Sequence, residues 1–365
     1  MSGLQIPFTG LQKQYSNLRN EVLDATDKVL RSGRLMDGNY TAEFEHWLAQ
    51  KNHVKHGVTV HSGTNALESI AAYYFKQLYS IKPKVIVPSV TFRATANAWL
   101  MAGWDIIVAD CDQYGMMDIN SVKQYHNDAI AVCLVGLYGN SLKNFKTAAF
   151  EKLCNNKSWL IVEDAAQHWL SWDCKRIAPT AISFDPMKNL GNYGNGGAVV
   201  TDIKELADFV RNYRAHGKGN EEYPIGSNSR MSEIDCATML IKSQHIDSWQ
   251  LRRRDISMHW IDRLANSSAR ALIDSSNSAE HCYHKFVIEV DHRDHVINTL
   301  KENGIDTKVH YTQCINEMAH TPVGVTPMLS RGVSLTRRVV SLPIYPELTD
   351  LEVEYIIDQV LDCVS

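Results

Sequence analysis

The sequence predicts an α/β protein with a mainly parallel, doubly wound sheet and a smaller C-terminal α+β domain. Over the first two-thirds of the chain, short β-rich runs alternate with helical stretches. Several of these runs are continuously apolar, as in Ala131–Val135, rather than alternating between apolar and polar residues. Strands that are buried on both faces have this composition, which favours parallel strands covered by helices. The β-then-α order therefore predicts an open sheet with helices packed on it.

The elements of the expected large domain follow from this alternation. The expected strands are Gly57–Val60, Val85–Val87, Ile106–Ala109, Ile130–Val135, Leu160–Glu163, Ala181–Phe184 and Gly197–Thr201. The expected helices are Ala66–Leu78, Ala94–Ala102, Leu142–Cys154 and Lys204–His216. We expect these strands to lie in one sheet that the helices cover.

The pattern changes near residue 232, where a long helical stretch without Gly or Pro runs over Ser232–Leu264. The elements expected after it are a strand at His284–Val290, a helix near His295–Glu302, a strand near Thr307–Tyr311 and a final helix at Thr349–Leu361. This order predicts a small α+β domain. We therefore expect a large domain over residues 1–245, which includes an N-terminal segment, and a small domain over residues 246–365.

Charge and composition argue against several classes of protein. The 365 residues include 37 Lys and Arg against 41 Asp and Glu, a net charge of −4, whereas a dedicated nucleic-acid binder usually shows a basic excess. No apolar run reaches the roughly 18–20 residues of a membrane span, and the first residues lack the profile of a secretory signal. The eight cysteines form no Cys-x-x-Cys pair, which favours reduced thiols in a cytoplasmic protein. We expect no metal site, because no carboxylate or thiol cluster accompanies His53 and His56.

Candidate functional residues follow the expected strands, because ligands of open α/β sheets bind at the carboxyl ends of the strands. The first are Ser62, Gly63 and Thr64, which open directly into an expected helix. The first N–H groups of a helix lack intrahelical partners and favour an anion, so this turn suits a phosphate. An ordinary βα turn with Ser62 or Thr64 as the helix N-cap is the alternative. The glycine patterns of a Rossmann dinucleotide site and of a P-loop are absent from the sequence.

Phe92 and Asp164 follow two further strands. The ring of Phe92 lies where it can stack on a flat cofactor, although core packing is the commoner role of a phenylalanine. Asp164 ends an apolar run, where a carboxylate can stabilise a ligand cation such as a protonated pyridine nitrogen. A protonated ring is a better electron sink. The alternative for Asp164 is the N-cap of a following helix.

Lys188 lies in a Gly- and Asn-rich loop between two expected strands, with Ser183 five residues before it. A loop lysine is normally exposed, but Met187 and Leu190 flank this one. A partly desolvated lysine has a lowered pKa and can act as a nucleophile or proton carrier, and the hydroxyl group of Ser183 can donate to a phosphate. In chain order, these segments offer a phosphate turn, an aromatic ring, an acid for a ring nitrogen and a Schiff-base lysine. A pyridoxal phosphate site requires this set of groups.

The same segments resemble those of the DegT/DnrJ/EryC1/StrS sugar aminotransferases, a family of fold-type-I pyridoxal-phosphate enzymes. The resemblance extends from about Ile6 to Leu361, and its motifs are Ser62–Leu67, Phe92, Glu163–Gln167, Ser183–Leu190 and Gly226–Glu233. It implies that Lys188 holds the cofactor as a Schiff base and that Asp164 meets its pyridine nitrogen. The other implied cofactor contacts are Ser62, Gly63, Thr64, Phe92, Gln167, Ser183 and Asn228.

The resemblance also implies partners and substrates. Asn228 would reach the phosphate bound to the neighbouring subunit of a homodimer with shared active sites. The weaker candidates for contact with sugar or nucleotide are Tyr193, Arg230, His310 and Tyr311. The substrates would be a nucleotide-linked keto sugar and an amino-acid donor, and neither nucleic acid nor membrane is an expected partner.

The implied activity is the transfer of an amino group from an amino acid, by family analogy glutamate, to a nucleotide-linked keto-deoxysugar. Lys242–Trp249 and Tyr283–Ile288 resemble relatives that aminate C3 of 3-keto-6-deoxyhexoses. Amination at C4 of a 4-keto-6-deoxyhexose is one alternative. A non-catalytic regulator that keeps the fold is another, because a fold alone does not fix a function.

Overall fold

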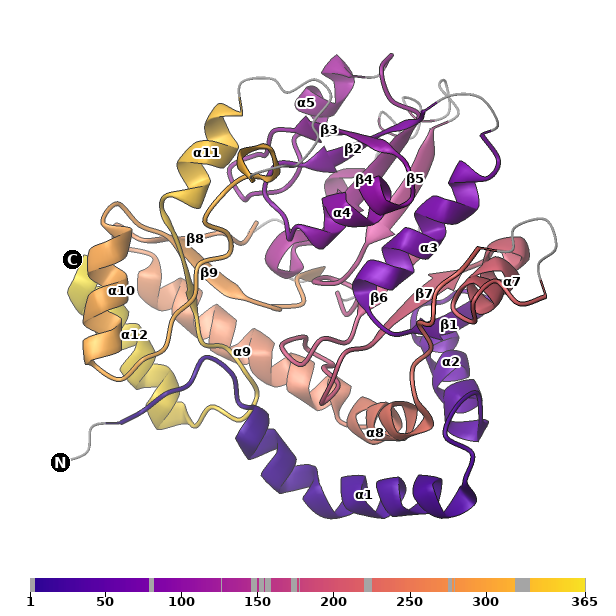
Figure 1. Ribbon diagram of the computed structural model, residues 1–365. Coiled ribbons are helices and arrows are strands. Elements are labelled where there is room, and N and C mark those ends of the chain that lie inside the picture. The colour runs from indigo at the N-terminus through magenta and orange to yellow at the C-terminus, as the bar shows by residue number, and fades with distance from the viewer. Residues whose placement is uncertain are drawn as a thin grey trace.

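The computed structural model describes residues 4–364 except 79–81, 126, 146–149, 151–153, 155–158, 172–175, 177, 220–224, 275–277, 279 and 319–328. Its largest feature is a seven-stranded sheet in the order β1-β7-β6-β5-β4-β2-β3 (Figure 1). The strands are β1 (His56–Val60), β2 (Lys84–Pro88), β3 (Asp105–Ala109), β4 (Ala131–Val135), β5 (Leu160–Asp164), β6 (Thr180–Ser183) and β7 (Gly197–Thr201). From β3 to β6 the neighbours are parallel, whereas β7 pairs antiparallel with β6 and β1. The expected mainly parallel sheet is confirmed.

Helices cover both faces of this sheet. Successive side chains of a strand point to opposite sides, so the continuously apolar strands have an apolar surface to bury on each face. The helices are α2 (Asn39–Lys51), α3 (Gly63–Phe75), α4 (Ala94–Met101), α5 (Ile119–Gln124), α7 (Lys204–Tyr213) and α8 (Glu233–Ser243). On one face, α3, α4 and α7 share a core with Val58, Val85 and Val162. On the other face, α2 and α8 pack with Ile182 and Val200, and α5 lies in a further core on that side.

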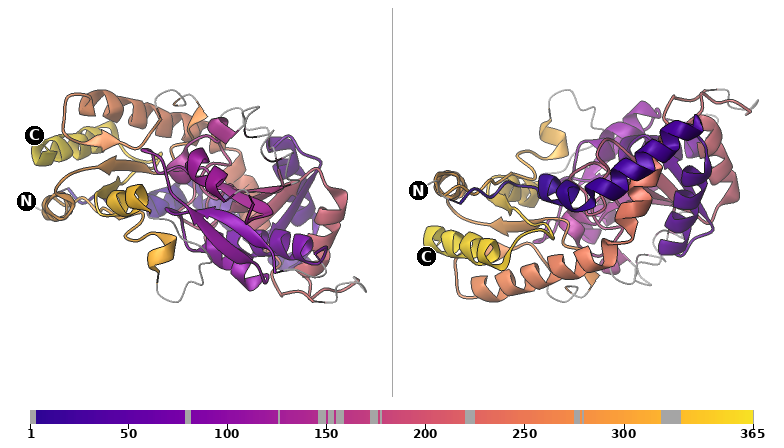
Figure 2. Two further views of the ribbon diagram at one scale, coloured as in Figure 1. Left: turned by 90° about the horizontal axis from the view of Figure 1, so that it is seen from above. Right: turned by 90° about the horizontal axis from the view of Figure 1, so that it is seen from below.

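A second sheet, three-stranded and antiparallel, has the order β10-β9-β8. Its strands are β8 (Arg270–Ala271), β9 (Phe286–Glu289) and β10 (Val339–Leu342), and the helices of this part are α9 (Ile246–Leu264), α10 (Arg293–Glu302), α11 (Ser330–Thr336) and α12 (Asp350–Val364). One apolar core joins the sheet to α9, α10 and α12 through residues such as Trp260 and Phe286. Ile6 belongs to the same core and pairs with Ile305. The first described residues and α12, which ends at Val364, therefore lie on the same side of the molecule (Figure 2).

The long helix α1 (Leu11–Ser32) connects the two parts. It starts near the small sheet and runs past α8 towards α2 (Figures 1 and 2). Three short 3-10 helices complete the described elements, at Leu137–Gly139, Lys143–Phe145 and Ile315–Glu317. Neither α1 nor α2 was expected from the sequence.

The single helix expected over Ser232–Leu264 is wrong. The structure has two helices, because α8 ends at Ser243 and α9 begins at Ile246. The physical reason is that α8 packs against the large sheet, whereas α9 packs against the small one. The break between the helices lets the apolar residues of α8 and those of α9 pack into two different cores. The division of the chain into two domains at residue 245 stays a prediction.

Two further expected elements need comment. Thr307–Tyr311 is not a strand, because a single bridge between Lys308 and Ser341 is its one β-type pairing among the described residues. Most of the expected helix Leu142–Cys154 lies outside the described residues, and its described start is the 3-10 helix Lys143–Phe145. The other expected strands and helices of the large sheet lie within a few residues of their predicted positions.

Three statements hold for the part of the chain that the structure describes. None of its helices is long and apolar enough to cross a membrane. It contains no group of three or more His, Cys, Asp or Glu side chains that could hold a metal ion. The cysteines in it, Cys111, Cys133, Cys154, Cys236, Cys282, Cys314 and Cys363, form no disulfide.

Candidate functional site

A cavity of about 390 Å³ lies at the carboxyl ends of β1, β5 and β6. Its lining includes ten residues predicted from the sequence, namely Ser62, Gly63, Thr64, Phe92, Asp164, Gln167, Ser183, Lys188, His310 and Tyr311. His284 and Lys285, which directly precede β9 of the small sheet, complete another wall. The cavity therefore forms where the two sheets approach each other.

The turn Ser62–Thr64 begins α3. Ser62 is the N-cap, and its Oγ accepts a hydrogen bond from the N–H of Asn65 at 3.1 Å. Gly63 and Thr64 belong to the first helical turn, which offers no intrahelical acceptor for their N–H groups, and both residues line the cavity. A Cβ on Gly63 would lie 2.7 Å from the Cβ of Ser183, so the close approach of these segments requires glycine. The turn is thus an N-cap and also suits an anion.

Asp164 ends β5, and only 6% of it is exposed. Thr95 Oγ1 donates a hydrogen bond to Asp164 Oδ2 at 2.7 Å, and the N–H of Ala166 donates to Oδ1 at 3.2 Å. A buried carboxylate needs such donors or a cation, and this one lines the cavity. The alternative role of a helix N-cap is wrong, because residues 166–170 form turns rather than a helix.

Lys188 lies in the loop between β6 and β7, where its N–H donates to the carbonyl of Asp185 at 2.8 Å. Its side chain lines the same cavity as Asp164. Burial lowers the pKa of Lys188, and the opposing effect of the Asp185 and Asp164 carboxylates is smaller. A lowered pKa increases the neutral fraction of the amine near pH 7, and the neutral amine is the form that attacks a carbonyl or accepts a proton.

Phe92 is 53% exposed and lines the cavity, with its ring centroid 6.1 Å from that of Tyr311. The core-packing alternative is therefore wrong for this residue. An exposed aromatic ring at the wall of a cavity is available to stack on a flat ligand.

Hydrogen bonds link the two walls of the cavity. Gln167 Oε1 accepts from the N–H of Tyr138 at 2.9 Å, and Gln167 Nε2 donates to the hydroxyl oxygen of Tyr311 at 3.1 Å. The Tyr138 hydroxyl donates to the carbonyl of His310, and His310 Nδ1 lies 2.8 Å from Ser341 Oγ of β10. Burial lowers the pKa of His310 to about 2, so its ring is neutral at physiological pH.

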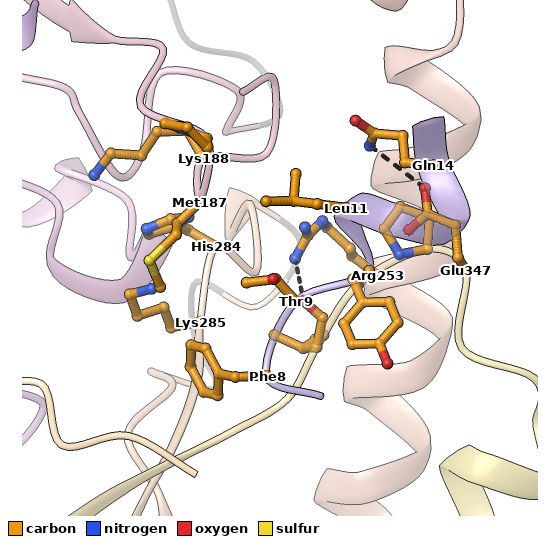
Figure 3. Close-up of a pocket in the computed structure, with 15 residues that line it drawn as sticks. Phe8, Thr9, Leu11, Gln14, Met187, Lys188, Arg253, His284, Lys285 and Glu347 are labelled. Atoms are coloured by element: carbon orange, nitrogen blue, oxygen red, sulfur yellow. Dashed lines mark hydrogen bonds between the residues drawn. The ribbon is translucent and has the colours of Figure 1, made fainter. Parts of the chain in front are cut away.

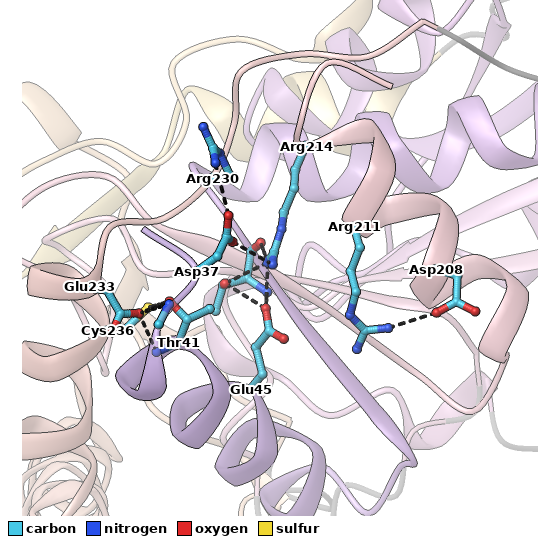
Figure 4. A network of polar contacts seen from close by, with 11 residues as sticks. Asp37, Thr41, Glu45, Asp208, Arg211, Arg214, Arg230, Glu233 and Cys236 are labelled. Carbon is cyan, nitrogen blue, oxygen red and sulfur yellow. Dashed lines mark hydrogen bonds and ion pairs between the residues drawn. The ribbon is translucent and has the colours of Figure 1, made fainter. Parts of the chain in front are cut away.

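Three predicted residues do not line this cavity. Arg230 Nη1 donates to Asp37 Oδ2 at 3.0 Å (Figure 4). The ring of Tyr193 packs against the Lys242 ammonium group, which lies 3.5 Å from the ring centroid. Asn228 is exposed and forms a backbone bridge with Ala215. The roles of these residues at the site stay predictions.

The lining also includes residues to which the sequence assigned no role at the site, among them Thr95, Asp185, His284 and Lys285. Thr95 lies three residues after Phe92, on the first turn of α4, and that spacing was the available signal. The signal for Lys285 was a charged residue directly before an apolar strand.

A smaller cavity of about 40 Å³ lies beside the first. It shares Met187, Lys188, His284 and Lys285 with the larger cavity. Its other wall includes Phe8 and Arg253, which belong to the N-terminal segment and α9 (Figure 3). The loop that carries Lys188 therefore lies between the two cavities.

Comparison with protein families gives one match that covers most of the chain. The model of the DegT/DnrJ/EryC1/StrS aminotransferase family matches residues 16–361. The chain belongs to this family. The protein is therefore an aminotransferase, and the resemblance noted in the sequence is confirmed.

Individual relatives match nearly the full length of the chain. The dTDP-3-amino-3,4,6-trideoxy-alpha-D-glucose transaminase of Streptomyces venezuelae is 33% identical, over 98% of this chain and 95% of its own. The pleiotropic regulatory protein of Geobacillus stearothermophilus is 29% identical, over 98% of each chain. The crystal structure of S. venezuelae DesV in complex with a ketimine intermediate superimposes with a TM-score of 0.90 at 30% identity, over 98% of each chain.

Proposed function

We propose that this aminotransferase uses pyridoxal phosphate to move an amino group from an amino acid, glutamate by analogy, to C3 of a nucleotide-linked 3-keto-6-deoxyhexose. The observation that carries the proposal is that Lys188, from the loop after β6, and Asp164, at the end of β5, line one cavity with the start of α3. A pyridoxal phosphate enzyme needs an amine, an acid for the ring nitrogen and a phosphate site in one place.

The residues of the cavity fit pyridoxal phosphate. The first turn of α3 offers N–H groups to a phosphate, and Gly63 keeps that turn close to Ser183. Asp164 is a buried carboxylate that can stabilise a protonated ring nitrogen. Phe92 offers an exposed ring for stacking, and Lys188 offers an amine with a lowered pKa.

When bound, the cofactor supplies an aldehyde that exchanges amino groups and a ring that accepts electrons. The chain's own residues then hold it and move protons. Asp164, to which Thr95 Oγ1 donates a hydrogen bond at 2.7 Å, would be the residue that holds the ring nitrogen. The amine of Lys188 would be the base that takes a proton from the α-carbon of the amino-acid donor and passes it to the C4′ atom of the cofactor.

The position of amination is inferred from relatives. Those named for the 3-position include the dTDP-3-amino-3,6-dideoxy-alpha-D-galactopyranose transaminase of Aneurinibacillus thermoaerophilus and the UDP-N-acetyl-3-dehydro-alpha-D-glucosamine 3-aminotransferase of Acidithiobacillus ferrooxidans. Another is named 3-oxo-glucose-6-phosphate:glutamate aminotransferase, which supports glutamate as the donor. His310 and Tyr311 line the cavity and are our candidate sugar contacts. Amination at C4 is the competing outcome, and analysis of the product separates the two.

Two features of the setting belong to the same proposal. We infer a homodimer with shared active sites, in which the exposed Asn228 reaches the partner's cofactor. We also infer a cytoplasmic enzyme, because the described cysteines form no disulfide.

The test is the variant Lys188→Ala, with Lys218→Ala at an exposed lysine as the control. After incubation with pyridoxal phosphate and borohydride, the wild-type protein and the control should gain the mass of one phosphopyridoxyl group, and Lys188→Ala should not. With glutamate and a dTDP-3-keto-6-deoxyhexose, the wild-type protein and the control should form the 3-amino sugar, and Lys188→Ala should not. Full labelling and turnover by Lys188→Ala would contradict the proposal.

A regulator is the second candidate, because one full-length relative is named a pleiotropic regulatory protein. The lowered pKa of Lys188 beside Asp164 favours catalysis, since a regulator needs neither group. A protein that binds the cofactor and turns over neither donor nor keto sugar would favour the regulator.

A further inference from the structure

Lys285 is a buried cation at the wall of the larger cavity. Only 6% of it is exposed, and its backbone N–H donates to the carbonyl of Tyr138 at 3.0 Å. This bond fixes the start of β9 against the loop after β4. The position of Lys285 is therefore set by the backbone and does not depend on an ion pair of its side chain.

The side chain of Lys285 differs from the other buried cations. The described chain buries five Lys or Arg side chains, namely Arg176, Arg214, Lys242, Arg253 and Lys285. The first four donate hydrogen bonds to protein oxygens. Within the described residues, the Lys285 ammonium group has no hydrogen-bond or ion-pair partner, and its nearest recorded contact is the ring of Phe8 at 5.4 Å from the centroid.

The surroundings of Lys285 are unfavourable to a lone cation. Burial is the main cause that lowers the pKa of Lys285 to about 7; the positive charges of Lys188 and Arg253 act in the same direction, and Asp185 acts in the opposite one. The two histidines nearby, His284 and His310, have lowered pKa values and are neutral. An unpaired buried charge is costly, and an arriving anion removes that cost.

The location of Lys285 indicates which ligand it can bind. In Figure 3 the side chains of Lys188 and Lys285 lie in the left part of the view, and Arg253 lies to the right of both. Both residues line the larger cavity, and they are the two Lys or Arg side chains among its described lining residues. Lys188 is the reacting amine in the proposed function. Lys285 is therefore the remaining Lys or Arg side chain of the described lining that can bind an anionic group of a substrate.

We propose that Lys285 binds a carboxylate group of the amino-acid donor. The inference rests on the proposed function in that the donor is an amino acid, whose α-carboxylate must enter the cavity with its amino group. A carboxylate and an ammonium group in a dry cavity form a strong, charge-assisted hydrogen bond. Lys285 then orients the donor without taking part in proton transfer.

The experiment measures the binding of glutarate, a dicarboxylate that cannot react, to the cofactor-loaded enzyme by calorimetry. Lys285→Met should weaken binding about tenfold or more, and Lys285→Arg should restore part of it. Lys301→Met, at an exposed lysine of α10, is the control and should bind as the wild type does. At pH 8 the wild-type enzyme should take up a proton on binding, seen as a heat that depends on the buffer, and Lys285→Met should not.

The outcomes separate this proposal from the proposed function. Equal glutarate affinity for the wild type and Lys285→Met would overturn the assignment, and so would a loss confined to glucuronate, which would mark Lys285 as a site for an acidic sugar. Lys285→Arg keeps the charge and guards against a folding defect in the methionine variant. If the enzyme makes no amino sugar but binds glutarate through Lys285, the proposed function fails and this inference stands.

Discussion

Thr95 donates a hydrogen bond to Asp164, and both residues line the larger cavity; we infer that Thr95 is a positioning residue for this carboxylate. Thr95 is fully buried, and its Oγ1 is 2.7 Å from Asp164 Oδ2 and 2.9 Å from Thr91 Oγ1. The Thr95 hydroxyl can donate one hydrogen bond, and the charged carboxylate is the stronger acceptor. The hydroxyl of Thr91 then donates to Thr95, which aligns the donor.

We expect Thr95→Val to lower turnover about tenfold, because a hydrogen bond to a charged group is worth roughly 1.5–3 kcal/mol. The variant keeps the volume of the side chain, so the fold should not change. Thr95→Ser restores the hydroxyl and should restore most of the activity. The readouts are steady-state turnover and the fraction of enzyme that keeps its cofactor after dialysis, and a serine variant as poor as the valine variant would argue against the hydrogen bond.

Single residues at strand ends could be predicted from the sequence. Asp164 and Ser62–Thr64 follow apolar strands directly, and parallel strands place their carboxyl ends at one edge of a sheet. Lys285 and Thr95 could not be assigned in this way. Their roles depend on which segment of the other sheet or helix lies opposite, and local sequence does not carry that information.

At the scale of elements, Glu233 joins α8 to α2. Its carboxylate accepts hydrogen bonds from the N–H groups of Gly38, Tyr40 and Thr41, at 2.9, 3.1 and 2.8 Å, and from the Thr41 hydroxyl (Figure 4). A side chain of α8 thus satisfies the open N-terminus of α2. A Cβ on Gly38 would lie 2.4 Å from Glu233 Oε2, so glycine is needed there.

We expect Glu233→Gln to lower the free energy of unfolding by about 2 kcal/mol, because the neutral amide keeps one acceptor and loses the charge. Urea unfolding measures the change. Glu43→Gln, on the exposed face of α2, is the matched control and should stay within about 0.5 kcal/mol of the wild type. Equal midpoints for the two variants would contradict the role of Glu233.

The strands were easier to predict than the outer helices, for a physical reason. Strands of the parallel sheet are buried on both faces and are apolar throughout, as β4 is. The helix α1 buries only Leu18, Val22 and Val29 of its 22 residues, so its sequence carries a weak apolar signal. The break at Gln244–His245 has no Gly or Pro to mark it, because packing against two different cores sets it.

The arrangement of the whole molecule leaves some predicted site residues outside the cavity of their own chain. Asn228 is exposed, and Arg230 donates a hydrogen bond to Asp37. A closed two-fold dimer would bring such a loop to the neighbouring subunit twice, once for each site. In that case each active site takes Lys188 from one protomer and Asn228 from its partner.

Mixed dimers test this arrangement. We expect Lys188→Ala and Asn228→Asp to be inactive as separate homodimers, the second because a carboxylate would repel the cofactor phosphate. Subunit exchange gives one intact site per mixed dimer, in which Lys188 of the aspartate variant meets the partner subunit's Asn228. Half of the dimers are mixed and half of their sites are intact, so activity should return to about a quarter of the wild-type value. If Asn228 acted on the cofactor of its own chain, both sites of a mixed dimer would carry a defect and no activity would return.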